Sequence, residues 1–208
     1  MNDPLIIGIS GGSGSGKTLF INKLKDSFNE SEVTILSLDN YYKPINKQPI
    51  DENGIENFDL PESLDENAFY EDLIKLKNGE SIKVHTYTFN NQNATPEQLH
   101  LEPSKILVVE GIFAFYFEKV NQLLDLRIFI EAPDYLMLSR RIIRDGNERG
   151  YDIEDVMYRF KNHVIPAYNQ FIGPLKSKSD LIIPNHTHFT KALEVIVNYI
   201  KFHLIEKL

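Results

Sequence analysis

Short apolar runs alternate with amphipathic segments along this chain of 208 residues. Five runs rich in Ile, Val and Leu have the length of buried strands, and they cover residues 5–10, 33–38, 106–110, 126–130 and 180–183. Helical periodicity follows the first run over residues 17–28, recurs over 65–78 and returns after Pro184 as far as Ile200. Continuous apolar strands that alternate with helices are typical of a parallel sheet covered on both faces, so we predict an α/β fold of this kind.

Two segments depart from that alternation. Over residues 79–101, SIKVHTYTFN has a period of two, and the polar stretch NNQNATPEQ separates it from HLEPS. This pattern predicts an antiparallel hairpin, inserted as a small lobe over a cleft in a single domain that spans residues 1–208. The aromatic run FAFYF at 113–117 is interpreted as the face of a helix that packs on the sheet.

Composition and charge narrow the classes of partner. The chain is 42% hydrophobic and 25% charged, which is enough apolar material for a core, and its net charge is −8. A protein that wraps a nucleic-acid backbone usually has a basic face, so we expect no nucleic-acid partner. No cysteine is present, and no run approaches the roughly 20 apolar residues of a membrane span. We therefore expect a soluble, cytoplasmic protein without a membrane partner.

The strand at residues 5–10 leads into a glycine-rich loop, in the stretch LIIGISGGSGSGKT. Gly11, Gly16, Lys17 and Thr18 fit the pattern G-x-x-x-x-G-K-[ST] between a strand and a helix, which is the context that a phosphate-binding loop requires. Glycines leave the backbone N–H groups free to surround an anion, and the positive end of the helix dipole points at the same place. The predicted nucleotide-binding residues are Gly11, Gly12, Ser13, Gly14, Ser15, Gly16, Lys17 and Thr18.

Two acidic residues stand at the carboxyl ends of predicted strands, where open α/β sheets bind their ligands. Asp39 follows ILSL and Glu110 follows ILVV. One such acid is typical of a strand terminator or a helix cap. Two of them beside a phosphate loop favour a catalytic site, because phosphoryl transfer needs a metal anchor and a group that accepts a hydroxyl proton.

Taken in order, several motifs resemble those of the uridine kinase and phosphoribulokinase family of P-loop kinases, and of uridine-cytidine kinases in particular. The resemblance covers nearly the whole chain. Its motifs are GGSGSGKT, SLDNYY, ENFDLPESLD, VVEGIF, RRIIRDGNERG and AYNQFIGPLKSKSDLIIPN. The fifth of these resembles the family's arginine lid, which would cover residues 140–151.

For the reacting groups, the resemblance implies a division of labour around ATP and Mg²⁺. Lys17 would contact the phosphates, and Thr18 and Glu110 would hold Mg²⁺. Asp39 would be the general base for the acceptor hydroxyl, close to the metal. Arg144 and Arg149 are the predicted lid residues that neutralise the transferring phosphoryl group.

For the acceptor, the resemblance implies contacts from Asp59 and Arg141 to the ribose hydroxyls and a position for Tyr42 near the substrate. Tyr87 and Gln92 stand on the hairpin that reads the base, and the Gln92 amide could hydrogen-bond a nucleobase.

The nucleobase end departs from the family pattern. The family's hairpin reads P-x-Y-D-F-x-x-H, whereas HTYTFNNQ lacks the aspartate and has Gln92 in place of the histidine. Tyr151 replaces an arginine of E-R-G-R-D, and Arg159 stands where uridine kinases tend to have glutamine. These changes alter which hydrogen bonds a base could make.

The sequence therefore predicts an ATP- and Mg²⁺-dependent kinase that phosphorylates a nucleoside-like small molecule, with the 5′-hydroxyl of a pyrimidine ribonucleoside as the leading acceptor. Three alternatives stay open: a kinase of the same family with another nucleoside, a sugar acid or a vitamin-like alcohol as acceptor; a regulatory nucleotide-binding protein without catalysis; and a nucleotide-hydrolysing switch. The chain has no N-K-x-D motif, which disfavours GTP. Assembly into a homo-oligomer is left open.

Overall fold

A parallel sheet forms the centre of the molecule in the computed structural model, which describes residues 3–89 and 95–206. Its five strands have the spatial order β2-β5-β1-β6-β7. They are β1 (Leu5–Ser10), β2 (Val33–Ser37), β5 (Ile106–Glu110), β6 (Leu126–Glu131) and β7 (Leu181–Pro184). The predicted parallel α/β fold is confirmed, and each strand agrees with the sequence pattern to within a residue at either end.

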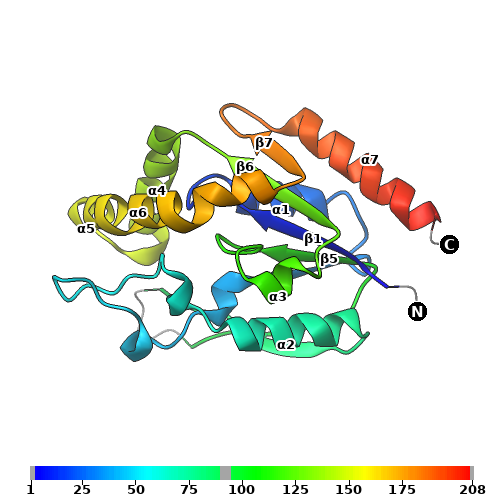
Figure 1. The fold of residues 1–208 in the computed structure, drawn as a ribbon, viewed down its shortest axis with the longest axis horizontal. Coiled ribbons are helices and arrows are strands. Elements are labelled where there is room, and N and C mark those ends of the chain that lie inside the picture. The colour runs from blue at the N-terminus through cyan, green and yellow to red at the C-terminus, as the bar shows by residue number, and fades with distance from the viewer. Residues whose placement is uncertain (1–2, 90–94, 207–208) are drawn as a thin grey trace.

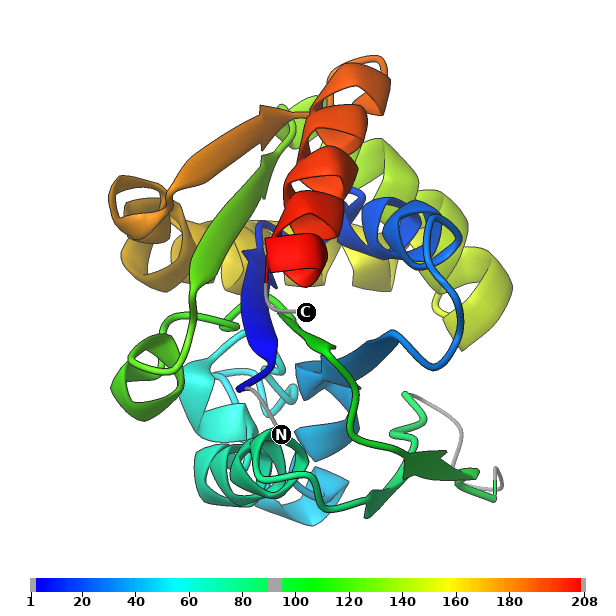
Figure 2. The same cartoon turned by 90° about the vertical axis from the view of Figure 1, so that its right-hand side faces the viewer.

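Helices cover both faces of this sheet. α1 (Lys17–Lys25) and α7 (Thr190–Glu206) lie on one face, while α2 (Glu66–Lys77) and α3 (Glu118–Asn121) lie on the other (Figures 1 and 2). Within the described residues, no helix has both the length and the apolar character needed to cross a membrane.

Alternate residues of β1 pack against the helices on opposite faces of the sheet. Ile7 and Ile9 belong to the apolar cluster that α1 and α7 complete, whereas Ile6 belongs to the cluster on the α2 side together with Phe69 and Phe113. All five side chains are fully or almost fully buried. Because successive side chains of a strand point to opposite faces, a strand with helices on both sides has to be apolar throughout.

The aromatic run at 113–117 corrects one prediction. These residues form successive turns instead of a helix, and α3 begins only at Glu118. Phe113, Phe115 and Phe117 are nevertheless buried against the sheet. Aromatic residues have modest helix propensity, and tertiary packing decides their backbone conformation here. The predicted packing is therefore present without the predicted helix.

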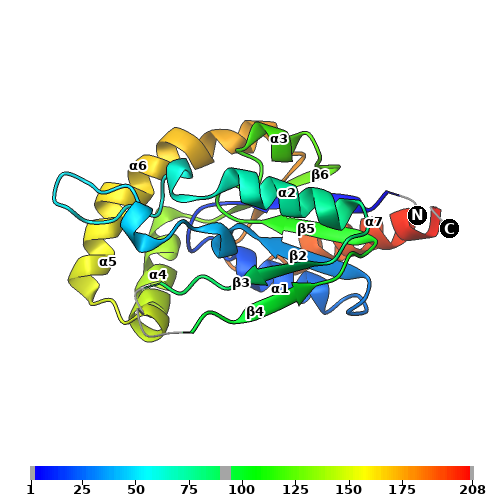
Figure 3. The ribbon, with the colours of Figure 1, turned by 90° about the horizontal axis from the view of Figure 1, so that it is seen from below.

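A helical layer closes the end of the molecule opposite the two termini (Figures 1 and 3). It begins with α4 (Asp134–Arg149), which contains most of the segment predicted as a lid, and turns at Gly150 into α5 (Ile153–Arg159). Two π-helical segments flank α6 (Ile165–Ala167), and a 3₁₀ segment leads to β7. These helices stand at the carboxyl ends of the strands.

The predicted hairpin strands form a separate antiparallel pair, β3 (Ile82–His85) and β4 (Gln98–Leu101). Ile82 and Val84 are buried on its inner face, while the alternate residues are exposed. Seen from below, the pair runs beside β2 towards α4 (Figure 3).

A loop before α2 is attached to the helical layer through one carboxylate. Asp51 accepts hydrogen bonds from the Tyr158 hydroxyl at 2.7 Å and from the backbone N–H of Ile55 at 2.9 Å, and its Oδ2 lies 2.8 Å from Nε2 of the buried His163. These hydrogen bonds, that of the Ile55 N–H first, hold the pKa of Asp51 below its usual range.

Replacement of this carboxylate tests the attachment. A depressed pKa stabilises the folded state above the unfolded-state pKa of about 3.9, and the contribution is lost as the pH falls through the lower, folded-state pKa. Asp51→Asn should therefore lower the thermal unfolding midpoint at neutral pH and flatten its acid dependence, as followed by circular dichroism. The exposed Glu30→Gln is the matched control, and equal midpoints for the wild type and Asp51→Asn at neutral pH would contradict the assignment.

Candidate active site

The loop between β1 and α1 has a backbone that only glycine fits at several positions, among them Gly14 and Gly16. Gly14 and Gly16 have φ angles of 82° and 98°, in the left-handed region. A Cβ on Gly14 would lie 2.5 Å from the carbonyl oxygen of Met137, and a Cβ on Gly16 would lie 2.3 Å from Nδ2 of Asn185. Both the turn and the close approach of α4 and β7 therefore require these glycines.

Carbonyl groups of this loop are occupied by side chains from three elements. Lys17 Nζ donates to two loop carbonyls, at 2.9 and 3.2 Å. Asn185 Nδ2 donates to the Ser15 carbonyl at 2.8 Å, and Arg140 Nη1 donates to the same oxygen at 3.1 Å. Gly16, which precedes α1, provides no side-chain cap. Carbonyls held in this way leave the N–H groups at the start of α1 for an anion.

The Ser37 hydroxyl connects the Glu110 carboxylate to the backbone of Asp39. Ser37 and Glu110 are register partners on β2 and β5, and the Ser37 hydroxyl donates to the Glu110 carboxylate. The same hydroxyl accepts from the backbone N–H of Asp39 at 3.2 Å. Burial, and then the negative charge of Asp39, raise the pKa of Glu110 to about 7, while Ser37 and Lys17 act in the opposite direction.

A divalent cation suits this group of oxygens. Asp39, Glu110 and the Thr18 hydroxyl line one cavity. In the described part of the chain, no three His, Cys, Asp or Glu side chains come together as a ready-made metal site. Mg²⁺ is commonly bound by one or two carboxylates together with water and substrate phosphates, so the available donors fit it. The pKa of Glu110 is raised by burial first and by the charge of Asp39 second, and such a cation would offset that charge.

Basic side chains dominate the same cavity, which has a volume of about 280 Å³. It is lined by Lys17 and five arginines against three acidic residues; the arginines are Arg140, Arg141, Arg144, Arg149 and Arg159. Burial lowers the pKa of Lys17, and the charges of Glu110 and Asp39 oppose this. A local excess of cations within a chain of net charge −8 indicates an anion-binding cavity.

A cluster of four aromatic rings lies at the side of the cavity nearest the β3–β4 pair, and three of them, Tyr42, Phe58 and Phe89, line the cavity. Every pair among Tyr42, Phe58, Tyr87 and Phe89 has its ring centroids 4.9 to 6.1 Å apart. The guanidinium of Arg149 lies 3.8 Å from the centroid of the Phe89 ring. Burial raises the pKa of Tyr42 well above its usual value. This arrangement combines apolar surface with a cation at the border of the phosphate side.

Most of the residues predicted from the sequence meet in this cavity. Its lining includes Ser13, Gly14, Gly16, Lys17, Thr18, Asp39, Tyr42, Asp59, Glu110, Arg141, Arg144 and Arg149. Gly11 and Gly12 are not in the lining and supply the carbonyls that accept from Lys17. Ser15 belongs to the loop, but it is fully buried and does not line the cavity. Tyr87 contacts the other aromatic rings without lining the cavity. Gln92 lies outside the described residues.

Other residues of the site had no role predicted from the sequence. Arg140 and Asn185 hold the loop carbonyls, Phe58 extends the aromatic cluster, and Asp145 lies behind the arginines. Asn185 directly follows β7, so its place at a strand carboxyl end was the available signal. Arg140 differs from its neighbour Arg141 only in which side of α4 it occupies, and the sequence alone does not give that.

Comparison with known proteins agrees with this geometry. The family model described as "Phosphoribulokinase / Uridine kinase family" matches residues 6–190. A uridine kinase of Borrelia duttonii (strain Ly) is 41% identical over 196 residues, which is 94% of each chain. The uridine-cytidine kinase B of Dictyostelium discoideum is 33% identical over 204 residues, or 98% of this chain and 84% of that protein.

A solved structure supports the fold independently of these sequences. The structure described as a possible uridine kinase from Bacillus stearothermophilus superposes with a TM-score of 0.62 over 88% of this chain and 89% of that one. The two chains are 17% identical, so this likeness concerns the fold alone.

Interaction between the two acids predicts a measurable change in protonation. Asp39→Asn removes a like charge beside Glu110, so the pKa of Glu110 should fall below its value of about 7. Carboxyl carbon NMR titration measures this shift directly. Asp59→Asn, which alters another acid of the same cavity, is the control and should leave that pKa in place. An unchanged or higher pKa in Asp39→Asn would show that the two acids do not interact.

Proposed function

Since the chain belongs to the phosphoribulokinase/uridine kinase family of kinases, we propose that it transfers the γ-phosphoryl group of ATP to the 5′-hydroxyl of a pyrimidine ribonucleoside. The observation that carries this proposal is one cavity in which a phosphate loop, two strand-end carboxylates and an arginine cluster face one another. A binding protein would need the loop, whereas transfer also needs the acids.

On the donor side, the loop N–H groups and Lys17 bind the phosphates. Thr18, Glu110 and Asp39 would hold Mg²⁺, which would supply positive charge to offset that of the phosphates. Arg144 and Arg149 bring positive charge to the γ-phosphoryl group, where negative charge spreads during transfer. The carbonyl contacts of Arg140 and Asn185 keep the loop in position throughout.

On the acceptor side, Asp39 accepts the proton of the attacking hydroxyl. A bond forms between the hydroxyl oxygen and the γ-phosphorus, the bond from that phosphorus to the bridging oxygen breaks, and ADP leaves with the electron pair. Asp59 and Arg141 hold the ribose hydroxyls. Both are buried, and their charged groups are 3.8 Å apart, so they form a fixed polar edge.

The nucleobase is assigned to the aromatic end of the cavity. Tyr42, Phe58 and Phe89 offer apolar faces there. Relatives similar in sequence over nearly the whole chain are named uridine kinase and uridine-cytidine kinase. Arg159 also lines this end, where its Nη1 donates to the backbone carbonyl of Glu56 at 2.6 Å. Its guanidinium lies 5.1 Å from the centroid of the Tyr151 ring.

A second candidate follows from those two residues. Tyr151 and Arg159 line the cavity in place of the residues that the family pattern leads one to expect. A site whose hydrogen-bond donors differ selects a different acceptor. The same transfer onto another nucleoside, a sugar acid or a vitamin-like alcohol is therefore the alternative.

A coupled assay of ADP release with the four common ribonucleosides and a set of non-nucleoside alcohols tests the proposal. Uridine or cytidine should give the fastest release, with a 5′-monophosphate as product in phosphorus NMR. Turnover on a non-pyrimidine acceptor alone would support the second candidate. ATP binding without turnover on any acceptor, or equal hydrolysis with no acceptor, would overturn the kinase proposal.

Removal of the proposed base should separate binding from transfer. Asp39→Asn keeps the shape of the side chain but cannot accept the proton, so kcat should fall by about 10²- to 10⁴-fold, the range typical of a general base. Calorimetry should show that ATP still binds.

The exposed Asp26→Asn at the end of α1 is the control for a generic charge change. If Asp39→Asn turned over at nearly the wild-type rate, Asp39 would not be the base.

A further inference from the structure

One acidic residue lies behind the arginine cluster and outside the cavity lining. Asp145 is on the last turns of α4, and its side chain is only 2% exposed. Its backbone carbonyl accepts from the N–H groups of Gly150 and Tyr151, which ends the helix. Its carboxylate serves a different purpose, because ion pairs join it to three arginines.

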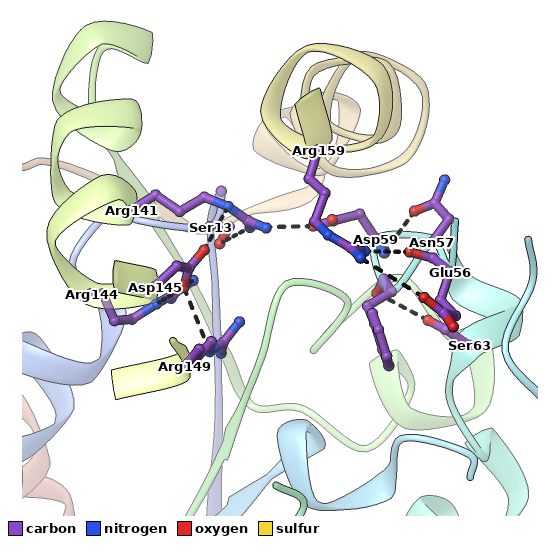
Figure 4. A network of polar contacts seen from close by, with 12 residues as sticks. Ser13, Glu56, Asn57, Asp59, Ser63, Arg141, Arg144, Asp145, Arg149 and Arg159 are labelled. Carbon is purple, nitrogen blue, oxygen red and sulfur yellow. Dashed lines mark hydrogen bonds and ion pairs between the residues drawn. The ribbon is translucent and has the colours of Figure 1, made fainter. Parts of the chain in front are cut away.

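All three arginines meet this carboxylate through the same edge of the guanidinium. Oδ1 accepts from Nε of Arg144 at 2.8 Å and lies 3.5 Å from Nε of Arg149, while Oδ2 lies 3.2 Å from Nε of Arg141. Figure 4 shows these side chains converging on Asp145 from α4 and from its end. Nη2 of Arg144 also lies 2.8 Å from Oδ1, so the carboxylate engages both Nε and Nη2 of that guanidinium. A guanidinium held by this edge directs its remaining amino group, Nη1, away from the carboxylate.

The terminal amino group of Arg141 reaches the phosphate loop. Nη1 of Arg141 donates to the Ser13 hydroxyl of the phosphate loop at 2.8 Å and lies 3.8 Å from the Asp59 carboxylate. Arg141, Arg144 and Arg149 all line the cavity, whereas Asp145 does not. The acid therefore acts on a substrate only through the arginines.

The charges in this cluster make the acid necessary. Three guanidinium groups that converge in a partly buried site repel one another. Burial, and then the charge of Arg144, lower the pKa of Arg149, and the charge of Asp145 opposes this. Without the carboxylate, the arginines would relieve their repulsion by moving apart.

We infer that Asp145 is a positioning residue for phosphoryl transfer, which holds the guanidinium groups of Arg141, Arg144 and Arg149 at the cavity wall before the substrates bind. Arg144 and Arg149 are thereby kept in place for the triphosphate, and Arg141 is kept between the phosphate loop and Asp59. This inference rests on the proposed function. Positioning of the arginines before the substrate binds matters because a misplacement of about 1 Å in such a cluster can lower the rate about 10²-fold.

Asp145→Asn is the test, because it preserves the side-chain shape and the backbone carbonyl that ends α4. We expect kcat to fall by about 10²-fold. In calorimetry, the ratio of ATP affinity to ADP affinity should fall, since the terminal phosphate depends most on the positioned arginines. Asp152→Ala is the control for a loss of stability: it removes the N-cap of α5, where the side chain accepts from Asp155 N–H, so it should lower thermal stability and leave kcat unchanged.

A second variant protects the test against a folding defect. Asp145→Glu retains the charge but shifts the carboxylate by one methylene, so its kcat should lie between those of the wild type and Asp145→Asn. A wild-type kcat in Asp145→Asn, or a loss that follows thermal stability in all three variants, would overturn the positioning role.

The affinity ratio is independent of any acceptor. If no acceptor supports turnover, the proposed function fails. A lower ratio of ATP affinity to ADP affinity in Asp145→Asn would still support the role of Asp145 in positioning the arginines. An unchanged or higher ratio would overturn it.

Discussion

The site depends on which partners hydrogen-bond to the main chain of the phosphate loop. Lys17, Arg140 and Asn185 bind the loop carbonyls from α1, α4 and the end of β7, so N–H groups are left for an anion. The left-handed turns at Gly14 and Gly16 are possible only without side chains, and neighbouring atoms fill the space where a Cβ would lie. The parallel sheet serves this loop by bringing three separate parts of the chain to one edge.

Charge balance connects the remaining parts of the site. Glu110 has a raised pKa because it is buried and lies beside Asp39, and Lys17 has a lowered pKa because it is buried, although the charges of Glu110 and Asp39 oppose this. Behind the arginines and outside the cavity lining, the negative charge of Asp145 offsets the repulsion among Arg141, Arg144 and Arg149. A cation would offset the repulsion between the two acids in the same way. In each cluster, charges of one sign lie close to a single charge of the opposite sign, and the proposed nucleotide and its metal would add charge that suits both clusters. The presence of both charge clusters in one cavity therefore favours a multiply charged substrate.

Much of this was predictable from the sequence. Strand-length apolar runs gave the sheet almost residue for residue, because strands buried on both faces have a strong pattern, and the complete loop motif located the anion site. The aromatic run at 113–117 was packed as predicted but was not helical, since burial there is decided by the sheet and not by periodicity. Arg140, Asn185 and Asp145 act through contacts between segments far apart in the chain or through one side of a helix. Local pattern carries little information of that kind.

The most direct measurement of the phosphate cradle is the affinity of the protein for ADP, AMP and adenosine, determined by calorimetry at one Mg²⁺ concentration. Each hydrogen bond to a charged group contributes about 1.5–3 kcal/mol, so loss of both phosphates should weaken binding by at least about 10²-fold. A stepwise fall from ADP to AMP to adenosine is the result expected if main-chain amides and Lys17 hold the phosphates. Equal affinity for ADP and adenosine would contradict it.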